Sequence, residues 1–325
     1  MAQFEDHANR RGGIIFELMR YRLQPWQLAA IVILLCAAAV AFAHWRSLKT
    51  YDAAALLQSL PPDQATHVFI AVGALRDSGI LDVLAGSKAE EEPDYRKFVS
   101  QTGFDYRSDM DAVAAAFFHG GAYFAIRGRF DWKKLSAYAK SQGGDCRNTV
   151  CSMPASQAGR YISFTPLNSD VLAMASTAEQ RGVNMIGPYQ WKTRPQLPPD
   201  PVWISTPSFA LSDVKDLPAG AQAFLSPLAQ ADRVTFAIGP DGNRLRIRVE
   251  ALCATPEVAA AMAKKLTDTT DLLKKMLERE KMTPNPRDLS GVLVAGTFQQ
   301  QDKRVTGTWP IERGFVEALA SGKIE

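Results

Sequence analysis

The longest hydrophobic pattern in the chain is an apolar run near the N-terminus. Between Trp26 and Trp45 the sequence reads WQLAAIVILLCAAAVAFAHW, and its strongly polar side chains, Gln27 and His44, lie close to the two ends. As a helix this stretch is roughly 30 Å long, enough to cross the hydrocarbon core of a bilayer. Tryptophans at both ends suit the two headgroup layers. The pattern predicts a transmembrane helix over residues 26–45, followed by a juxtamembrane segment over 46–65.

Charge on either side of this run predicts its orientation. Four arginines precede it, whereas only Arg46 and Lys49 follow closely. Because positive charge marks the cytoplasmic side, residues 1–25 are expected to form a cytoplasmic tail of a single-pass protein in the bacterial inner membrane. The remaining chain is then periplasmic or extracellular. The alternative is a signal peptide cleaved after Ala43, at the sequence Ala41-Phe42-Ala43.

After the run, the hydrophobic period alternates between that of strands and that of helices. A first α+β region is expected over residues 66–186, with strands at 67–72, 112–118, 123–130, 161–165 and 171–175. Helical patterns cover 75–84, 95–101 and a stretch up to Gln142 for which Asp131 is the expected N-cap. A short helix is expected from Thr177. The order is strand, helix, two strands, helix, two strands, helix.

A proline-rich linker is expected over residues 187–201, which contain five prolines. The same element order then returns in a second α+β region over 202–325. Its strands are expected at 202–205, 233–238, 245–253, 292–299 and 304–309, and its first helix at 219–230. Thr255 is the expected N-cap of a long helix that has Pro256 at its first position and ends near Glu280.

Together these patterns predict an α+β protein in which one N-terminal transmembrane helix is followed by two tandem ferredoxin-like domains of the βαββαβ type. The segment RLRIRVEAL alternates basic and apolar side chains, which is typical of a strand with one wet face. The repeat lies in the order of elements and not in residue identity.

Three segments of the first region carry a resemblance to known proteins: SLPPDQATHVFIAVGALRDSG, DYRKFVSQTGFDYRSDMDAV and RGRFDWKKLSAYAK. They resemble a group of bacterial proteins that have one N-terminal span and an exported α+β region. The resemblance covers about the first half of the exported part. It implies that topology and brings no activity, substrate or catalytic residue.

Composition narrows the function classes. The chain has 37 basic and 34 acidic residues and a formal net charge of +3, so it lacks the strong positive field of a nucleic-acid-binding protein. The common phosphate, dinucleotide and hydrolase motifs are absent from the sequence. We therefore expect no cofactor and no nucleic-acid partner.

The cysteines are candidates for a covalent link. Cys146 and Cys151 close the short polar segment CRNTVC, and in an oxidising compartment they are expected to form a disulfide, with two free thiols as the alternative. Their spacing lacks the two further ligands of a zinc site, so no metal site is predicted. Cys36 lies in the apolar run, and Cys253 shares a strand face with apolar residues.

The weak catalytic candidates are Asp105, Asp109 and Asp111, from the segment FDYRSDMD, and His119 beside Gly120. Clustered carboxylates bind Ca²⁺ or act as an acid and base pair, but this spacing does not match a calcium loop. Turn formation and helix capping are the alternative for the carboxylates, and a position in a hairpin turn is the alternative for His119.

These observations leave three hypotheses of function. The first is a non-enzymatic, membrane-anchored binding or scaffolding protein of the cell envelope, whose partners are the bilayer, through the N-terminal helix, and another envelope protein. The second is an exported hydrolase that uses the acidic and histidine candidates. The third is a carrier of a hydrophobic ligand, for which a sizeable apolar cleft is expected.

Overall fold

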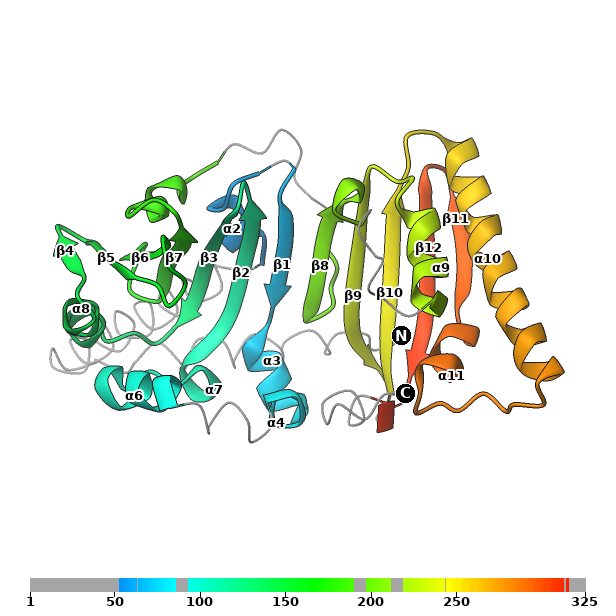
Figure 1. The fold of residues 1–325 in the computed structure, drawn as a ribbon, viewed down its shortest axis with the longest axis horizontal. Coiled ribbons are helices and arrows are strands. Elements are labelled where there is room, and N and C mark those ends of the chain that lie inside the picture. Colours follow the sequence, from blue (N-terminus) through cyan, green and yellow to red (C-terminus); the bar gives the residue numbers. More distant parts are fainter. Residues whose placement is uncertain are drawn as a thin grey trace, which may run out of the picture. The chain divides into compact units, whose positions relative to one another are not determined.

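The computed structural model describes residues 53–62, 64–85, 93–189, 197–211, 219–242, 244–312 and 314–315. The chain divides into two units, Met1–Thr50 and Tyr51–Glu325, and every described residue belongs to the second. Figure 1 shows the helices and strands of that second unit.

A single 12-stranded sheet forms its centre, and every pair of neighbouring strands is antiparallel. The order across the sheet is β11-β12-β10-β9-β8-β1-β2-β3-β7-β6-β5-β4. In chain order the strands are β1 (Thr66–Ile70), β2 (Met110–Phe118), β3 (Gly121–Gly128), β4 (Asp145–Arg147), β5 (Val150–Pro154), β6 (Tyr161–Pro166), β7 (Val171–Thr177), β8 (Val202–Pro207), β9 (Arg233–Asp241), β10 (Arg244–Leu252), β11 (Thr297–Gln301) and β12 (Arg304–Ile311).

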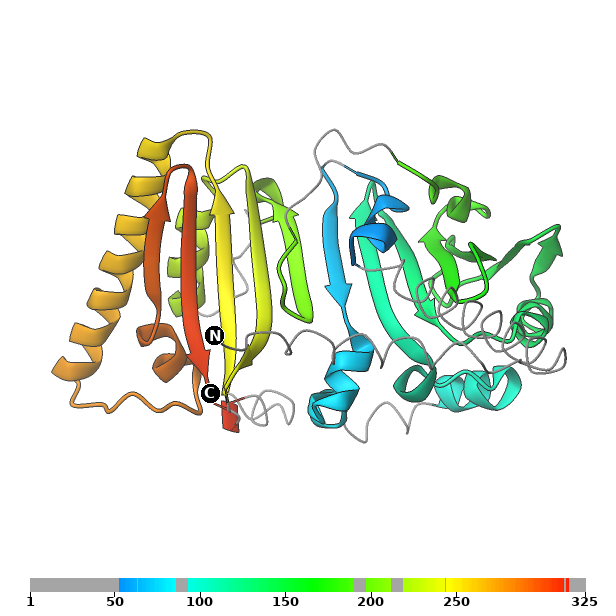
Figure 2. The same ribbon diagram turned by 180° about the vertical axis from the view of Figure 1, so that it is seen from behind.

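Helices pack on both faces of the sheet. The described helical elements are α2 (Ala53–Gln58), α3 (Val72–Asp77), α4 (Ile80–Ala85), α6 (Pro93–Thr102), α7 (Tyr106–Asp109), α8 (Trp132–Ser141), η2 (Gly182–Met185), η3 (Ser208–Leu211), α9 (Ala219–Leu228), α10 (Pro256–Arg279) and α11 (Leu289–Val294). We call the face towards the viewer in Figure 1 the front face; it carries α8 over one part of the sheet and α9, α10 and α11 over another. The opposite, back face carries α2 and η2 (Figure 2).

The two halves of the sheet share one strand order. The first half runs β1-β2-β3-β7-β6, with β5 and β4 added at its outer edge, and the second runs β8-β9-β10-β12-β11; the halves meet where β1 pairs with β8. In that pair Ile70 lies opposite Val202 and Val68 opposite Ile204. The prediction of two tandem ferredoxin-like domains is therefore wrong. Hydrogen bonding between β1 and β8 merges the strands of both regions into one antiparallel sheet, and β1 pairs directly with β2, whereas the split βαβ of a ferredoxin-like core places another strand between the two strands that a helix joins.

The transmembrane prediction also needs correction. Residues 26–45 lie outside the described part of the chain, and none of the described helices is long and apolar enough to cross a membrane. The fold class is thus an α+β protein dominated by one antiparallel sheet, without support for the predicted span. The predicted cellular location stays a prediction.

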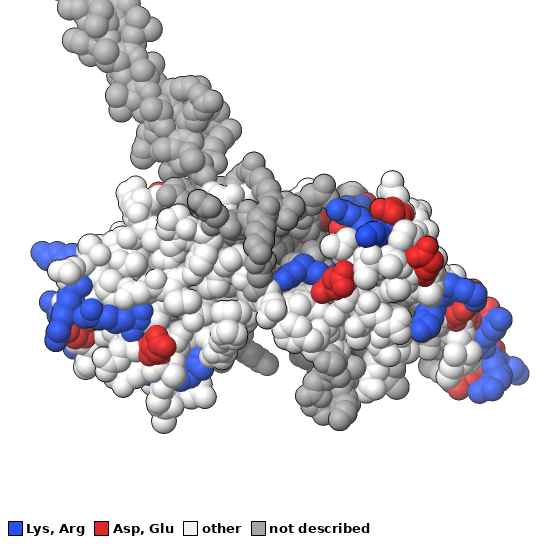
Figure 3. All heavy atoms as spheres, turned by 90° about the horizontal axis from the view of Figure 1, so that it is seen from above, with Lys and Arg blue, Asp and Glu red and all other residues white. Residues whose placement is uncertain are grey.

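Over the centre of the front face the described α-helices are α3 and α4, which pack on Ile70, Val113 and Val202 at one end of the strands, whereas Ile204 and Phe117 further along stay partly exposed. In each half the longest front helix follows the third strand: α8 follows β3 and α10 follows β10. These helices pack over the outer strands of their own half, so β2, β1 and β8 lie in view between them in Figure 1. Seen from above in Figure 3, charged side chains gather at the left, over the part with α8, and at the right, over the part with α10.

Candidate ligand-binding site

The three candidate aspartates lie together around α7, where their contacts are structural. Asp105 caps α7 by accepting a hydrogen bond from the Arg107 amide (2.9 Å), and it also accepts one from the Tyr95 hydroxyl (2.8 Å). Asp109 accepts from the Asp105 amide (2.9 Å). Each carboxylate oxygen in these contacts accepts from a protein donor, which is the capping and turn arrangement expected as the alternative to catalysis.

Ion pairs complete the arrangement. Asp109 Oδ1 lies 3.0 Å from Arg129 Nη2, and Asp111 Oδ1 lies 3.4 Å from Arg76 Nη2. Partial burial acts to raise the pKa of Asp109, but the Asp105 amide and the Arg129 guanidinium outweigh it and hold this pKa below its ordinary value. A depressed pKa keeps Asp109 ionised at neutral pH, as a stabilising anion and not as a general acid.

His119 lies at the other end of β2 from these carboxylates. The aspartates are at the start of the strand, whereas His119 follows its last residue, Phe118, in the turn before β3. Its φ of 47° is left-handed, and its ring stacks on Phe118 with 3.7 Å between ring centroids. The 9 residues of β2 separate Asp105 and Asp109 from His119, and Asp111 is the second residue of that strand, so the structure does not bring the candidates into one site. Within the described ranges no three acidic, histidine or cysteine side chains gather at a metal-binding distance.

A disulfide joins Cys146 and Cys151, with an S–S distance of 2.04 Å. The two residues lie opposite each other in the pairing of β4 with β5, at one edge of the sheet. The polar segment between them is therefore a tight hairpin and not an irregular loop. Several strands separate this hairpin from β8 and β9 at the centre of the sheet.

A large apolar cavity lies where the two halves of the sheet meet. Its volume is about 590 Å³, within the range of about 300 to 1,000 Å³ typical of ligand pockets. One wall is formed by α3 and α4, and the other by the ends of β9, β10 and β12. The start of β8 and the preceding residues 198–201 form a third wall.

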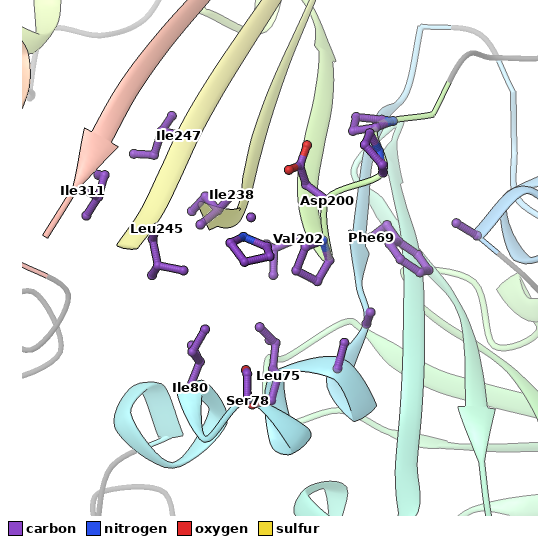
Figure 4. Close-up of a pocket in the computed structure, with 18 of the residues that line it drawn as sticks. Phe69, Leu75, Ser78, Ile80, Asp200, Val202, Ile238, Leu245, Ile247 and Ile311 are labelled. Atoms are coloured by element: carbon purple, nitrogen blue, oxygen red, sulfur yellow. The ribbon is translucent and has the colours of Figure 1, made fainter. Parts of the chain in front are cut away.

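Nearly all of the lining is apolar. Among the described lining residues only Ser78 and Asp200 have polar side chains, and the Ser78 hydroxyl already donates to the Leu75 carbonyl (3.0 Å). The lining consists of Ala53, Phe69, Ala71, Ala74, Leu75, Ser78, Ile80, Pro198, Pro199, Asp200, Pro201, Val202, Ile238, Gly239, Pro240, Leu245, Ile247, Ile311 and Phe315. Figure 4 shows Leu75, Ser78 and Ile80 reaching from α3 and α4 towards Leu245 and Val202 on the opposite side.

The charge of Asp200 is compensated on the back of the cavity. Oδ2 of its buried carboxylate lies 2.9 Å from Arg248 Nη2, and the same nitrogen donates a hydrogen bond to Oδ1 at 3.2 Å. In Figure 4 this carboxylate points away from α3 and α4. A side chain at Gly239 would collide with it, because a Cβ there would lie 2.1 Å from Asp200 Oδ1. The missing side chain at Gly239 thus lets residues 198–201 pack against β9.

Sequence patterns alone do not point to this cavity. The prolines at 198, 199 and 201 fit the pattern of a linker, whereas in the structure they form a wall of the cavity. One usable signal is present, because the apolar side of RLRIRVEAL contributes Leu245 and Ile247 to the lining. The sequence pattern does not predict the pairing of β1 with β8, and this pairing brings α3 opposite β10.

Comparisons with known proteins give little beyond this geometry. No protein-family model and no curated protein matches the chain. Three crystal forms of TP0453 are similar in structure. Form III has a TM-score of 0.47 at 12% identity and covers 82% of this chain and 96% of that one. Form IV has a TM-score of 0.41 at 14% identity and covers 82% of this chain and 95% of that one. Form I has a TM-score of 0.40 at 12% identity and covers 83% of this chain and 98% of that one. We draw no functional conclusion from this likeness.

Proposed function

We propose that this protein binds an apolar ligand in the cavity between α3, α4 and the ends of β9, β10 and β12. The observation that supports the proposal is the lining: about 590 Å³ of space walled by apolar side chains, with Ser78 and Asp200 as the polar exceptions among the described lining residues. The function is that of a binding or carrier protein for a hydrophobic molecule.

The physical argument concerns water. Apolar surface transferred out of water stabilises a complex by about 25 cal/mol per Å², so a hydrophobic molecule gains free energy on entering such a space. Ser78 and Asp200 do not oppose entry, because the hydroxyl is bonded to Leu75 and the carboxylate is paired with Arg248. The Ser78 hydroxyl therefore needs no polar partner from the ligand, and Arg248 balances the charge of Asp200, although Asp200 Oδ2 makes no hydrogen bond of its own.

The hydrolase hypothesis receives no such support. Its candidate residues are separated by the length of β2, and Asp105, Asp109 and Asp111 are engaged in capping and ion pairs. None of them belongs to the described lining of the apolar cavity.

Filling the cavity tests the proposal. Ala74 lies on α3 with its side chain exposed into the space, so Ala74→Trp adds a large ring there without displacing a packed residue. We expect the affinity for an uncharged apolar dye such as Nile red, followed by fluorescence titration, to fall by about tenfold or more.

The matched control is Asp77→Trp, which adds the same ring on the same helix at an exposed position outside the lining. It should bind the dye as the wild type does. Both variants should show unchanged thermal unfolding. If Ala74→Trp folds normally and binds Nile red as tightly as the control, the cavity is not the binding site and the proposal is wrong.

A further inference from the structure

An apolar path leaves the cavity and runs along the centre of the front face, beyond the part that α3 and α4 cover. Cross-strand pairing places Val202 opposite Ile238 at the cavity, and then Ile204 opposite Phe236 and Val68 one row further along the sheet. The next row reaches Phe117 and Thr66, which are also opposite each other. We call the residues of these three rows the apolar path: Val202, Ile238, Ile204, Phe236, Val68, Thr66 and Phe117.

Solvent reaches this path even though its residues are hydrophobic. Ile238 is 40% exposed, Ile204 38% and Phe117 47%. No charged residue occupies any of the three rows on β2, β1, β8 and β9, and Thr66 and Thr206 share a hydrogen bond of 2.7 Å. A contiguous exposed apolar strip of this kind is typical of a binding surface.

The path ends at a second cavity of about 490 Å³ that has a different chemical character. Thr66 and Phe117 belong to its lining, together with His119 and Arg160. Arg160 donates to the backbone oxygens of Gly120 (2.8 Å) and Ser176 (2.6 Å), and no carboxylate within the described ranges forms an ion pair with it. Among the described residues, Arg160 is therefore held by backbone oxygens and has no ion pair with an acidic side chain.

A further cavity that contains arginines is less suited to an anion. It lies beside residues 197–199 and has a volume of about 360 Å³. Of its arginines, Arg248 is paired with Asp200 at 2.9 Å and Arg304 with Glu250 at 2.7 Å. An anion entering there would meet Glu250 as well, whereas the cavity at Arg160 has no acidic side chain in its described lining.

We propose that the ligand is a long-chain fatty acid bound as a monomer, with its tail end in the apolar cavity, its chain along the apolar path and its carboxylate at Arg160. This inference rests on the proposed function, since it names the class of molecule that the same cavity takes. Val202 and Thr206 are separated by about 13 Å along β8, so a ligand that reaches both ends is long and linear. A compact ring system would fill the cavity and leave the path empty.

The test compares palmitate with hexadecanol, which has the same chain and no charge, by displacement of Nile red from the full-length protein. We expect Arg160→Gln to weaken palmitate binding by about tenfold and to leave hexadecanol unchanged, because the charge-assisted contact to the carboxylate is lost while the contacts of the hydrocarbon chain remain. Arg160→Lys should restore most of the affinity for palmitate. Octanoate, too short to span cavity and path, should bind far more weakly than palmitate.

The path has its own variant and control. Ile204→Asp places a charge in the middle row and should weaken palmitate binding. Leu252→Asp changes a residue of similar exposure, 43%, on the back face, and should have no effect. Both sites are partly exposed, and thermal unfolding of the two variants should match that of the wild type.

The outcomes separate the two proposals. If Ala74→Trp abolishes palmitate binding while Ile204→Asp and Arg160→Gln leave it unchanged, the ligand sits in the cavity alone; this inference is then wrong and the proposed function stands. Equal losses of palmitate and hexadecanol in Arg160→Gln would also overturn it. Binding of the protein to vesicles that contain fatty acid, without binding to monomeric palmitate, would overturn this inference as well. Palmitate binding that survives Ala74→Trp would refute the proposed function itself.

Discussion

At the scale of single residues, the carboxylates around α7 and the cavity serve structure. Asp105 caps a helix, Asp109 bridges a backbone amide and Arg129, and Asp200 fastens the wall of the cavity to Arg248. In each case a donor already occupies the carboxylate, and the exposed apolar side chains lie elsewhere. The cavity therefore offers a ligand the burial of apolar surface and no free carboxylate.

Asp109 makes a pH-dependent contribution to stability. Its pKa is lowered in the folded protein, so its stabilising effect is present above the unfolded-state pKa of about 3.9 and is lost as the pH falls through the lower folded-state pKa. We expect Asp109→Asn to lower the free energy of unfolding by about 1–2 kcal/mol at neutral pH, because the charge-assisted bond to Arg129 is lost. Urea unfolding over a pH series measures the difference, which should shrink in acid.

Asp145→Asn is the matched control. This carboxylate also pairs with an arginine, Arg147, at 2.7 Å, but both side chains are largely exposed. Exposed pairs contribute about 0–1 kcal/mol, so the control should change stability little. A difference between wild type and Asp109→Asn that stays constant down to strongly acidic pH would contradict the role assigned to Asp109.

At the scale of elements, the hairpin of β4 and β5 depends on its disulfide. These strands lie at the end of the sheet, and β4 has β5 as its single neighbour among the described strands. By the chain-entropy estimate, closing so short a loop contributes about 2 kcal/mol. Reduction should therefore loosen the hairpin locally. We expect hydrogen exchange measured by mass spectrometry to rise over residues 145–154 when the disulfide is reduced, with little change in β1, β8 and β9.

Those central strands serve as the internal control for this measurement. Uniform deprotection of the whole sheet would show that the disulfide supports the global fold. Unchanged exchange in the hairpin would show that strand pairing alone holds it.

Local chemistry makes many elements predictable. Asp131 caps α8 by accepting from the Lys134 amide, and Thr255 caps α10 with Pro256 at its first turn, as the sequence predicts. Prediction fails where local signals compete. Residues 292–294 are β-branched or apolar and match a strand pattern, yet Asp288 caps a helix there and places them in α11. In place of the helix expected from Thr177, the structure has the short 3-10 turn η2.

At the scale of the whole sheet, the decisive contact joins distant parts of the chain. The Ala71 amide donates to the Pro201 carbonyl at 2.7 Å, just beyond the pairing of Ile70 with Val202. Alternation identifies β1 and β8 as strands but carries no information on their partners, because any apolar strand face matches many others. The cavity exists through this pairing, so neither its lining nor the apolar path is predictable from single elements.

The binding of a fatty acid at this junction is tested most directly by crystallography of the full-length protein with a long-chain fatty acid that carries bromine on its terminal carbon. We predict anomalous bromine signal inside the cavity, between Leu75 on α3 and Leu245 on β10, and carboxylate density beside Arg160. Bromine signal confined to other surfaces, or an empty cavity at saturating ligand, would contradict the proposed site.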